Sequence, residues 1–127
     1  MKVICFRGKS NTGKSTIIKK ILNEVYNIKL IPDKRDFSLI FEYNRKKIGI
    51  CSYGDTLDAL KKYLKPLINA NCDIIICACH TKGGTLRFIM REFSSLVRFI
   101  ECKRVEKDRL NDKIRNKVNE FRKVMST

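Results

Sequence analysis

The sequence predicts an α/β domain in which helices cover both faces of a mostly parallel central sheet with one β-hairpin. Short apolar runs alternate with amphipathic segments along the chain. The most hydrophobic run, Ile74–Cys79, contains no polar residue, which is typical of a strand buried on both faces of a parallel sheet. The length of 127 residues suits one compact domain, so we expect residues 1–127 to form a single unit.

The first strand and helix are predicted close to the start of the sequence. Residues Val3–Phe6 form a short apolar run that ends before a glycine, as expected of a buried strand. Residues Thr16–Tyr26 carry isoleucine, leucine and valine at helical spacing, which predicts an amphipathic helix. Pro32 and Asp33 then mark a loop.

The β-hairpin is predicted in the segment that follows this loop. Phe37–Tyr43 and Lys47–Tyr53 are strand-like runs, and residues 44–46 between them have the composition of a turn.

Helices and strands continue to alternate after the hairpin. Asp55 or Thr56 can cap a helix, and Pro66 is expected to kink that helix or end it early. Ile74–Cys79 follows as a strand, and Leu96–Cys102 as another. Two more helices are predicted from their apolar side chains, which are Leu86, Ile89, Met90 and Phe93 for the first and Leu110, Ile114, Val118, Phe121 and Met125 for the second.

A glycine-rich motif lies between the first predicted strand and helix. Residues 8–15 fit the pattern G-x-x-x-x-G-K-[ST] without a mismatch, as Gly8-Lys9-Ser10-Asn11-Thr12-Gly13-Lys14-Ser15. On these residues the chain resembles the P-loop NTPase superfamily, whose Walker A loop has this pattern between a strand and a helix. The resemblance implies a three-layer P-loop NTPase fold that binds a nucleoside triphosphate with Mg²⁺.

The residue types of the motif suit phosphate binding. Gly8 and Gly13 permit backbone angles that point successive N–H groups at one anion. The positive end of the following helix adds to that field. The resemblance implies that Lys14 reaches the β- and γ-phosphates, that Ser15 ligates Mg²⁺, and that Thr16 lies near the α-phosphate. We therefore expect residues 8–16 to bind the phosphate chain, with Lys14 also acting in catalysis.

The resemblance also implies a second acidic group, which holds the Mg²⁺ water shell at the end of a hydrophobic strand beside the first. The hairpin ends in Gly54-Asp55, whereas Ile74–Cys79 ends in His80 without a carboxylate. Asp55 is therefore the expected catalytic and metal-binding acid. Its alternative role is that of a helix cap, and the two roles can coexist. Asp73 precedes its strand and is expected at the opposite end of the sheet.

Polar residues after the central strand are further candidates. Ligands of open α/β sheets bind at the carboxyl ends of the strands, so His80 is a candidate to sense the γ-phosphate or to orient a water. A purely structural histidine is the alternative. Arg87 and Arg91 lie one helical turn apart. Together with Lys82 they are candidates for a lid over the transferring phosphate or for a contact with a nucleic-acid backbone. A plain solvated basic face is the alternative.

Three branches of the superfamily stay open from the sequence. The order of residues 10–15 is similar to the loop of translation-factor-type GTPases, but the D-x-x-G and N/T-K-x-D motifs of guanine-specific enzymes are absent. Lys9 is placed as in the deviant Walker A loop of the nitrogenase-iron-protein class. The compact size and the basic segment resemble small P-loop kinases, many of which hold an acceptor-binding acid where Asp33 and Asp36 lie.

Charge and cysteine content restrict the partners. The chain has 28 Lys and Arg against 13 Asp and Glu, a net charge of +15. This excess favours nucleotides or nucleic acid, and a lysine-rich proteome is the alternative explanation. Both halves of the chain carry a similar excess, which argues against a dedicated nucleic-acid stripe. Because the chain has no Trp and most of its Phe residues fit core patterns, any nucleic acid is expected to bind through its backbone without sequence readout. The six cysteines lack zinc-type spacing and are expected to be buried thiols in a reducing compartment.

The sequence therefore predicts a small cytoplasmic P-loop enzyme. No apolar run is long enough to cross a bilayer, and the first residues do not form a signal peptide. The expected activity is Mg²⁺-dependent binding of ATP with hydrolysis or γ-phosphoryl transfer, and GTP is the alternative nucleotide. The alternative functions are a non-catalytic nucleotide- or nucleic-acid-binding module and a GTPase-like switch.

Overall fold

The structure, a computed structural model, describes residues 1–30 and 36–126, so the loop predicted at Pro32 and Asp33 lies outside the described residues. The strands within these ranges are β1 (Lys2–Arg7), β2 (Ser38–Tyr43), β3 (Lys46–Cys51), β4 (Ile74–Cys79) and β5 (Val97–Glu101). The α-helices are α1 (Lys14–Glu24), α2 (Leu57–Asn69), α3 (Gly84–Phe93) and α4 (Leu110–Met125). Short 3₁₀ helices precede β5 and α4, at Ser94–Leu96 and Lys107–Arg109.

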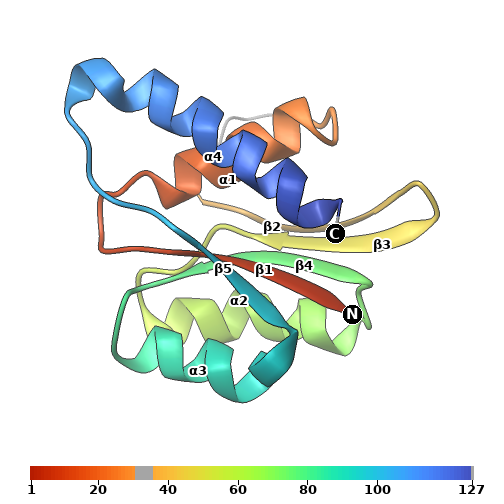
Figure 1. Cartoon of the computed structure of the whole chain (residues 1–127). Coiled ribbons are helices and arrows are strands. Elements are labelled where there is room, and N and C mark those ends of the chain that lie inside the picture. The colour runs from red at the N-terminus through yellow and green to blue at the C-terminus, as the bar shows by residue number, and fades with distance from the viewer. Residues whose placement is uncertain (31–35, 127) are drawn as a thin grey trace.

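The strands form one mixed, mostly parallel sheet in the order β2-β3-β4-β1-β5 (Figure 1). β1 pairs in parallel with β4 and β5, and β4 pairs in parallel with β3. β3 pairs antiparallel with β2. The predicted α/β class with one hairpin is therefore confirmed. Because β1, β3, β4 and β5 run in the same direction, their carboxyl ends meet at one edge of the sheet.

Helices cover both faces of this sheet. Figure 1 shows α1 and α4 on one face and α2 and α3 on the other. Alternate residues of β1 pack on opposite faces, Ile4 against the α1 and α4 side and Val3 against the α2 and α3 side. Every residue of β4 is buried, as its apolar sequence predicted. All six cysteines are buried free thiols.

The hairpin turn is shorter than predicted. β3 begins at Lys46, so the turn consists of Asn44 and Arg45, and both have positive φ (51° and 65°). Two-residue hairpin turns require this left-handed backbone, which asparagine tolerates but arginine rarely adopts. Because arginine is rare in such a turn, the sequence predicted a three-residue turn and not the two-residue turn that forms.

Two helices differ from their predicted bounds. α1 runs from Lys14 to Glu24, two residues earlier at each end than predicted, because its first turn carries motif residues and no apolar signal. α2 continues through Pro66 to Asn69, so the prediction that the proline could end it early is wrong. Pro66 is exposed, and the buried leucines on the opposite face hold the helix despite one lost backbone hydrogen bond.

The buried faces of α3 and α4 also differ in detail from the apolar pattern. In α3, Phe88 is buried and Met90 is 47% exposed. In α4, Leu110 is exposed, whereas Lys113 is buried. Within residues 1–30 and 36–126, no helix combines the length and hydrophobicity that crossing a bilayer requires.

Candidate functional site

The glycine-rich loop, residues 8–15, leads from the end of β1 into the first turn of α1 at the carboxyl edge of the sheet. The backbone N–H of Gly8 donates to the carbonyl oxygen of Cys79 at the end of β4 (3.1 Å). Asn11 and Gly13 have positive φ (62° and 81°), a backbone conformation that turns neighbouring N–H groups to one side. No described side chain caps the first turn of α1, so its N-terminal N–H groups are available to an anion.

The side chain of Lys14 folds over the glycine-rich loop. Its ammonium donates hydrogen bonds to the carbonyl oxygens of Gly8 (2.7 Å) and Lys9 (2.8 Å). The residue is 5% exposed. Burial lowers the pKa of Lys14, and the nearby Asp55 carboxylate opposes part of that effect. The loop thus contains a fixed, poorly solvated positive charge, which favours the approach of an anion.

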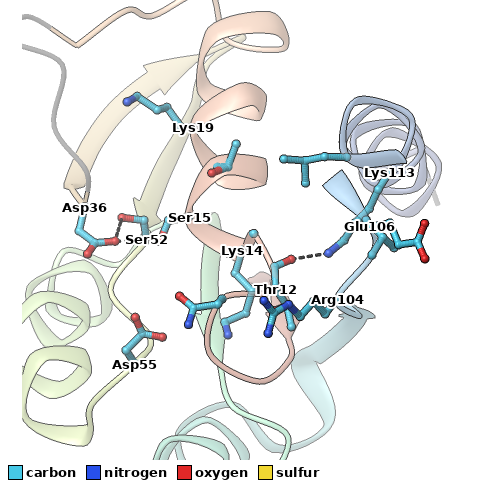
Figure 2. Close-up of a pocket in the computed structure, with 15 residues that line it drawn as sticks. Thr12, Lys14, Ser15, Lys19, Asp36, Ser52, Asp55, Arg104, Glu106 and Lys113 are labelled. Carbon is cyan, nitrogen blue, oxygen red and sulfur yellow. Dashed lines mark hydrogen bonds between the residues drawn. The ribbon is translucent and has the colours of Figure 1, made fainter. Parts of the chain in front are cut away.

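Asp36 contacts the hydroxyl group of Ser15. The Ser15 hydroxyl donates to Asp36 Oδ1 (2.8 Å), and the Ser52 hydroxyl donates to the same oxygen (3.1 Å). Figure 2 shows the three side chains together beside α1. Ser52 is buried directly after β3, so it helps to fix the carboxylate. The sequence marked Asp36 as a candidate acceptor-binding acid, but no local pattern indicated its contact with Ser15.

Asp55 reaches the same edge of the sheet by a different route than expected. β4 separates β3 from β1, so Asp55 does not follow a strand beside the first. The connection after β3 instead passes against β4, where a Cβ at Gly54 would lie 2.6 Å from the carbonyl oxygen of Ala78. This close approach brings Asp55 to His80. The Nε2 atom of His80 lies 2.8 Å from the Asp55 carbonyl oxygen and 3.9 Å from its carboxylate.

A cavity of about 890 Å³ opens beside the glycine-rich loop (Figure 2), within the size range of ligand-binding pockets. Residues 11–16 line one side, and the connection from β5 into α4 lines another. The cavity is rich in charge. Its charged residues are Lys14, Lys19, Arg104 and Lys113 with Asp36, Asp55 and Glu106.

Lys113 contacts the glycine-rich loop from α4. Its ammonium donates a hydrogen bond to the carbonyl oxygen of Thr12, as the dashed line in Figure 2 shows. Sequence reasoning missed this residue. A lysine on a helix with many lysines carries no signal of burial, and only the packing of α4 over the loop places it in the cavity.

Not every predicted site residue lines the cavity. Of residues 8–16, residues 11–16 do so, whereas Lys9 and Ser10 are exposed on the loop. His80 adjoins the cavity through its contact with Asp55. The basic residues after β4 are exposed and are not among the lining residues; these are Lys82, Arg87 and Arg91.

Comparison with known proteins does not assign a family. No protein-family model, curated protein or solved structure matches the chain significantly. The geometry and chemistry of the cavity are therefore what indicate a function.

Proposed function

We propose that this chain binds a Mg²⁺-nucleoside triphosphate in the cavity, with ATP as the preferred nucleotide, and hydrolyses it or transfers its γ-phosphoryl group. In this proposal the α/β architecture is a P-loop NTPase fold. The observation that carries the proposal is the joint placement of Lys14, Ser15 and Asp36 at the start of α1. An ammonium, a hydroxyl and a carboxylate lie there beside helix N–H groups that no described side chain caps, in a cavity of nucleotide size.

The phosphate chain is proposed to lie over residues 11–16. Backbone N–H groups of the loop and of the first turn of α1 donate to phosphate oxygens, and the helix dipole adds to the attraction. Lys14 exchanges its carbonyl partners on Gly8 and Lys9 for phosphate oxygens. Its ammonium then neutralises charge on the transferring group.

Ser15 and Asp36 are suited to Mg²⁺ because hydroxyl and carboxylate oxygens are the hard ligands that this ion prefers. The two groups already share one hydrogen bond of 2.8 Å. Asp55, which lines the same cavity, is proposed to hold the water shell of the ion. Bound Mg²⁺ would neutralise phosphate charge and help to orient the phosphates.

The proposed reaction is an in-line displacement at the γ-phosphorus. An oxygen atom of water or of an acceptor forms the new P–O bond. The bond to the β–γ bridging oxygen breaks, the nucleoside diphosphate leaves, and the attacking oxygen loses its proton to the surrounding water. His80, placed against Asp55, is proposed to orient the attacking group or contact the γ-phosphate. Arg87 lies outside the cavity, so we assign it no role in this step.

The proposal is tested by measuring binding of MgATP and MgGTP, together with phosphate release, in the wild type and in Lys14→Ala. We expect the wild type to bind ATP in preference to GTP. Lys14→Ala removes the buried ammonium and should weaken ATP binding roughly tenfold or more. Unchanged ATP affinity in Lys14→Ala would contradict the proposal.

Lys20→Ala is the matched control. Lys20 lies on the same helix, is exposed and pairs with Glu24 (3.3 Å), so its loss removes the same charge outside the cavity. ATP affinity should be unchanged in this variant. Binding without phosphate release or transfer by the wild type would support the non-catalytic alternative, and a preference for GTP would support a GTPase-like switch.

A further inference from the structure

Lys113 is a buried cation that the proposed chemistry does not use. It lies in the first turn of α4, and its ammonium donates to the carbonyl oxygen of Thr12, 101 residues earlier in the chain. The residue is 8% exposed and lines the cavity. Figure 2 shows its side chain extending from α4 toward the glycine-rich loop.

The positive charge of Lys113 lacks a carboxylate partner within the described residues. Burial lowers the pKa of Lys113, and the positive charges of Lys117 and Lys14 act in the same direction. A buried ammonium without an opposite charge is costly, and an anion in the cavity reduces that cost. Lys14 is a second buried ammonium in the same cavity, so the site suits a ligand with several negative charges.

The contact with Thr12 also fixes one peptide of the loop. The Thr12 carbonyl and the Gly13 N–H belong to one planar trans peptide and point in opposite directions. An ammonium on the carbonyl oxygen therefore leaves the N–H pointing away from the Lys113 side, and it polarises the peptide so that the N–H becomes a stronger donor. A Cβ built on Gly13 would lie 4.0 Å from Lys113 Nζ, so α4 and the loop are in close contact at this peptide.

We propose that Lys113 completes the phosphate-binding site from α4, by holding the Gly13 N–H toward the bound phosphate chain and adding a second buried positive charge beside Lys14. This inference rests on the proposed function and deepens it. Lys113 is thus a positioning residue that acts on the phosphates of the ligand, and it makes no contribution to recognition of the nucleoside.

The test uses two ligands, MgATP and inorganic tripolyphosphate, which has the phosphate chain without base or sugar. Lys113→Met should weaken binding of both ligands by a similar factor of roughly ten or more. Lys113→Arg keeps the charge and should recover part of the affinity. If the methionine variant folds poorly, Lys113→Gln removes the charge while keeping a donor for Thr12, and the same comparison applies.

Lys117→Met is the matched control, because Lys117 lies one turn further along α4, pairs with Glu120 (3.1 Å) and does not line the cavity. It should leave both affinities within about twofold of the wild type. The inference would be overturned if Lys113→Met lost affinity for ATP alone, or if it kept its affinity for both ligands. A wild type that binds ATP but not tripolyphosphate would also overturn it. A wild type that binds neither ligand overturns the proposed function itself.

Discussion

Asp36 and Asp55 both line the cavity, but their surroundings differ. Asp36 is partly buried and accepts hydrogen bonds from the hydroxyls of Ser15 and Ser52 on one oxygen. The side chain of Asp55 is 62% exposed and lies near His80. A carboxylate held by two donors is already ordered for metal binding, whereas an exposed carboxylate can move toward the ligand. In the proposed Mg²⁺ site we therefore assign the direct metal contact to Asp36 and the water shell to Asp55.

These assignments predict different phenotypes for two isosteric changes. Asp36→Asn should reduce the gain in ATP affinity on adding Mg²⁺ by about tenfold, since an amide oxygen keeps the Ser15 contact but not the charge. Asp55→Asn should keep Mg²⁺-dependent binding and lose turnover. ATP-binding titrations with and without Mg²⁺ test the role of Asp36, and measurements of phosphate release test the role of Asp55. Full Mg²⁺ dependence in Asp36→Asn, or full turnover in Asp55→Asn, contradicts the corresponding role.

Residues of the site differ in how far they could be predicted from sequence. Residues 8–16 form a contiguous motif, so the sequence alone predicts that they lie close together. The contact between Asp36 and Ser15 depends on how the segment before β2 returns to α1. The burial of Lys113 depends on where α4 packs. Contacts of this kind are set by tertiary structure, and no periodicity of the chain encodes them.

The path of the connection between β3 and α2 depends on Gly54. Gly54 is buried against β4, and its missing side chain lets residues 52–56 cross the end of that strand toward the cavity. The apolar runs predicted all five described strands and the four helices between and after them. They did not predict that β4 lies between β1 and β3, because neighbouring buried strands have similar compositions and differ only in long-range pairing.

Gly54→Ala should destabilise the fold and displace Asp55. The new methyl group would meet the carbonyl oxygen and the Cβ of Ala78 at 2.6 and 2.8 Å, and overpacking of this kind costs about 1–3 kcal/mol. Urea unfolding should show the lower stability, and turnover of the folded protein should fall because the connection moves away from His80.

Ile75→Val in β4 is the control for stability alone. Ile75 is fully buried against α2 and α3, and removing one methyl group costs about 0.5–1.5 kcal/mol. This variant should keep its turnover. Equal turnover in Gly54→Ala and Ile75→Val would show that the Gly54 connection does not position Asp55.

Positive charge is spread over the protein as well as gathered in the cavity. The net charge is +15, and four of the basic side chains line the cavity together with three acidic ones. Most of the excess therefore lies elsewhere on the surface. Such a surface attracts polyanions without selecting their sequence.

The net charge predicts weak, salt-sensitive binding to nucleic acid. Two unrelated DNA oligonucleotides of equal length should be shifted equally at low salt, and their affinity should fall by orders of magnitude between about 50 and 200 mM salt. Lys14→Ala should not change this binding, because the buried ammonium is not part of the surface. If neither oligonucleotide is shifted at low salt, the excess of positive charge is a general feature of the composition and does not serve nucleic-acid binding.

The contact between Lys113 and Thr12 joins parts of the chain that are 101 residues apart. A ligand in the cavity would touch the first helix, the connection after β3 and the last helix at once. None of these segments alone forms the cavity, so only the intact fold would bind such a ligand, and its affinity would be thermodynamically linked to cooperative unfolding of the sheet and its helices. Saturating ligand should then delay hydrogen exchange throughout the central strands, far from the glycine-rich loop.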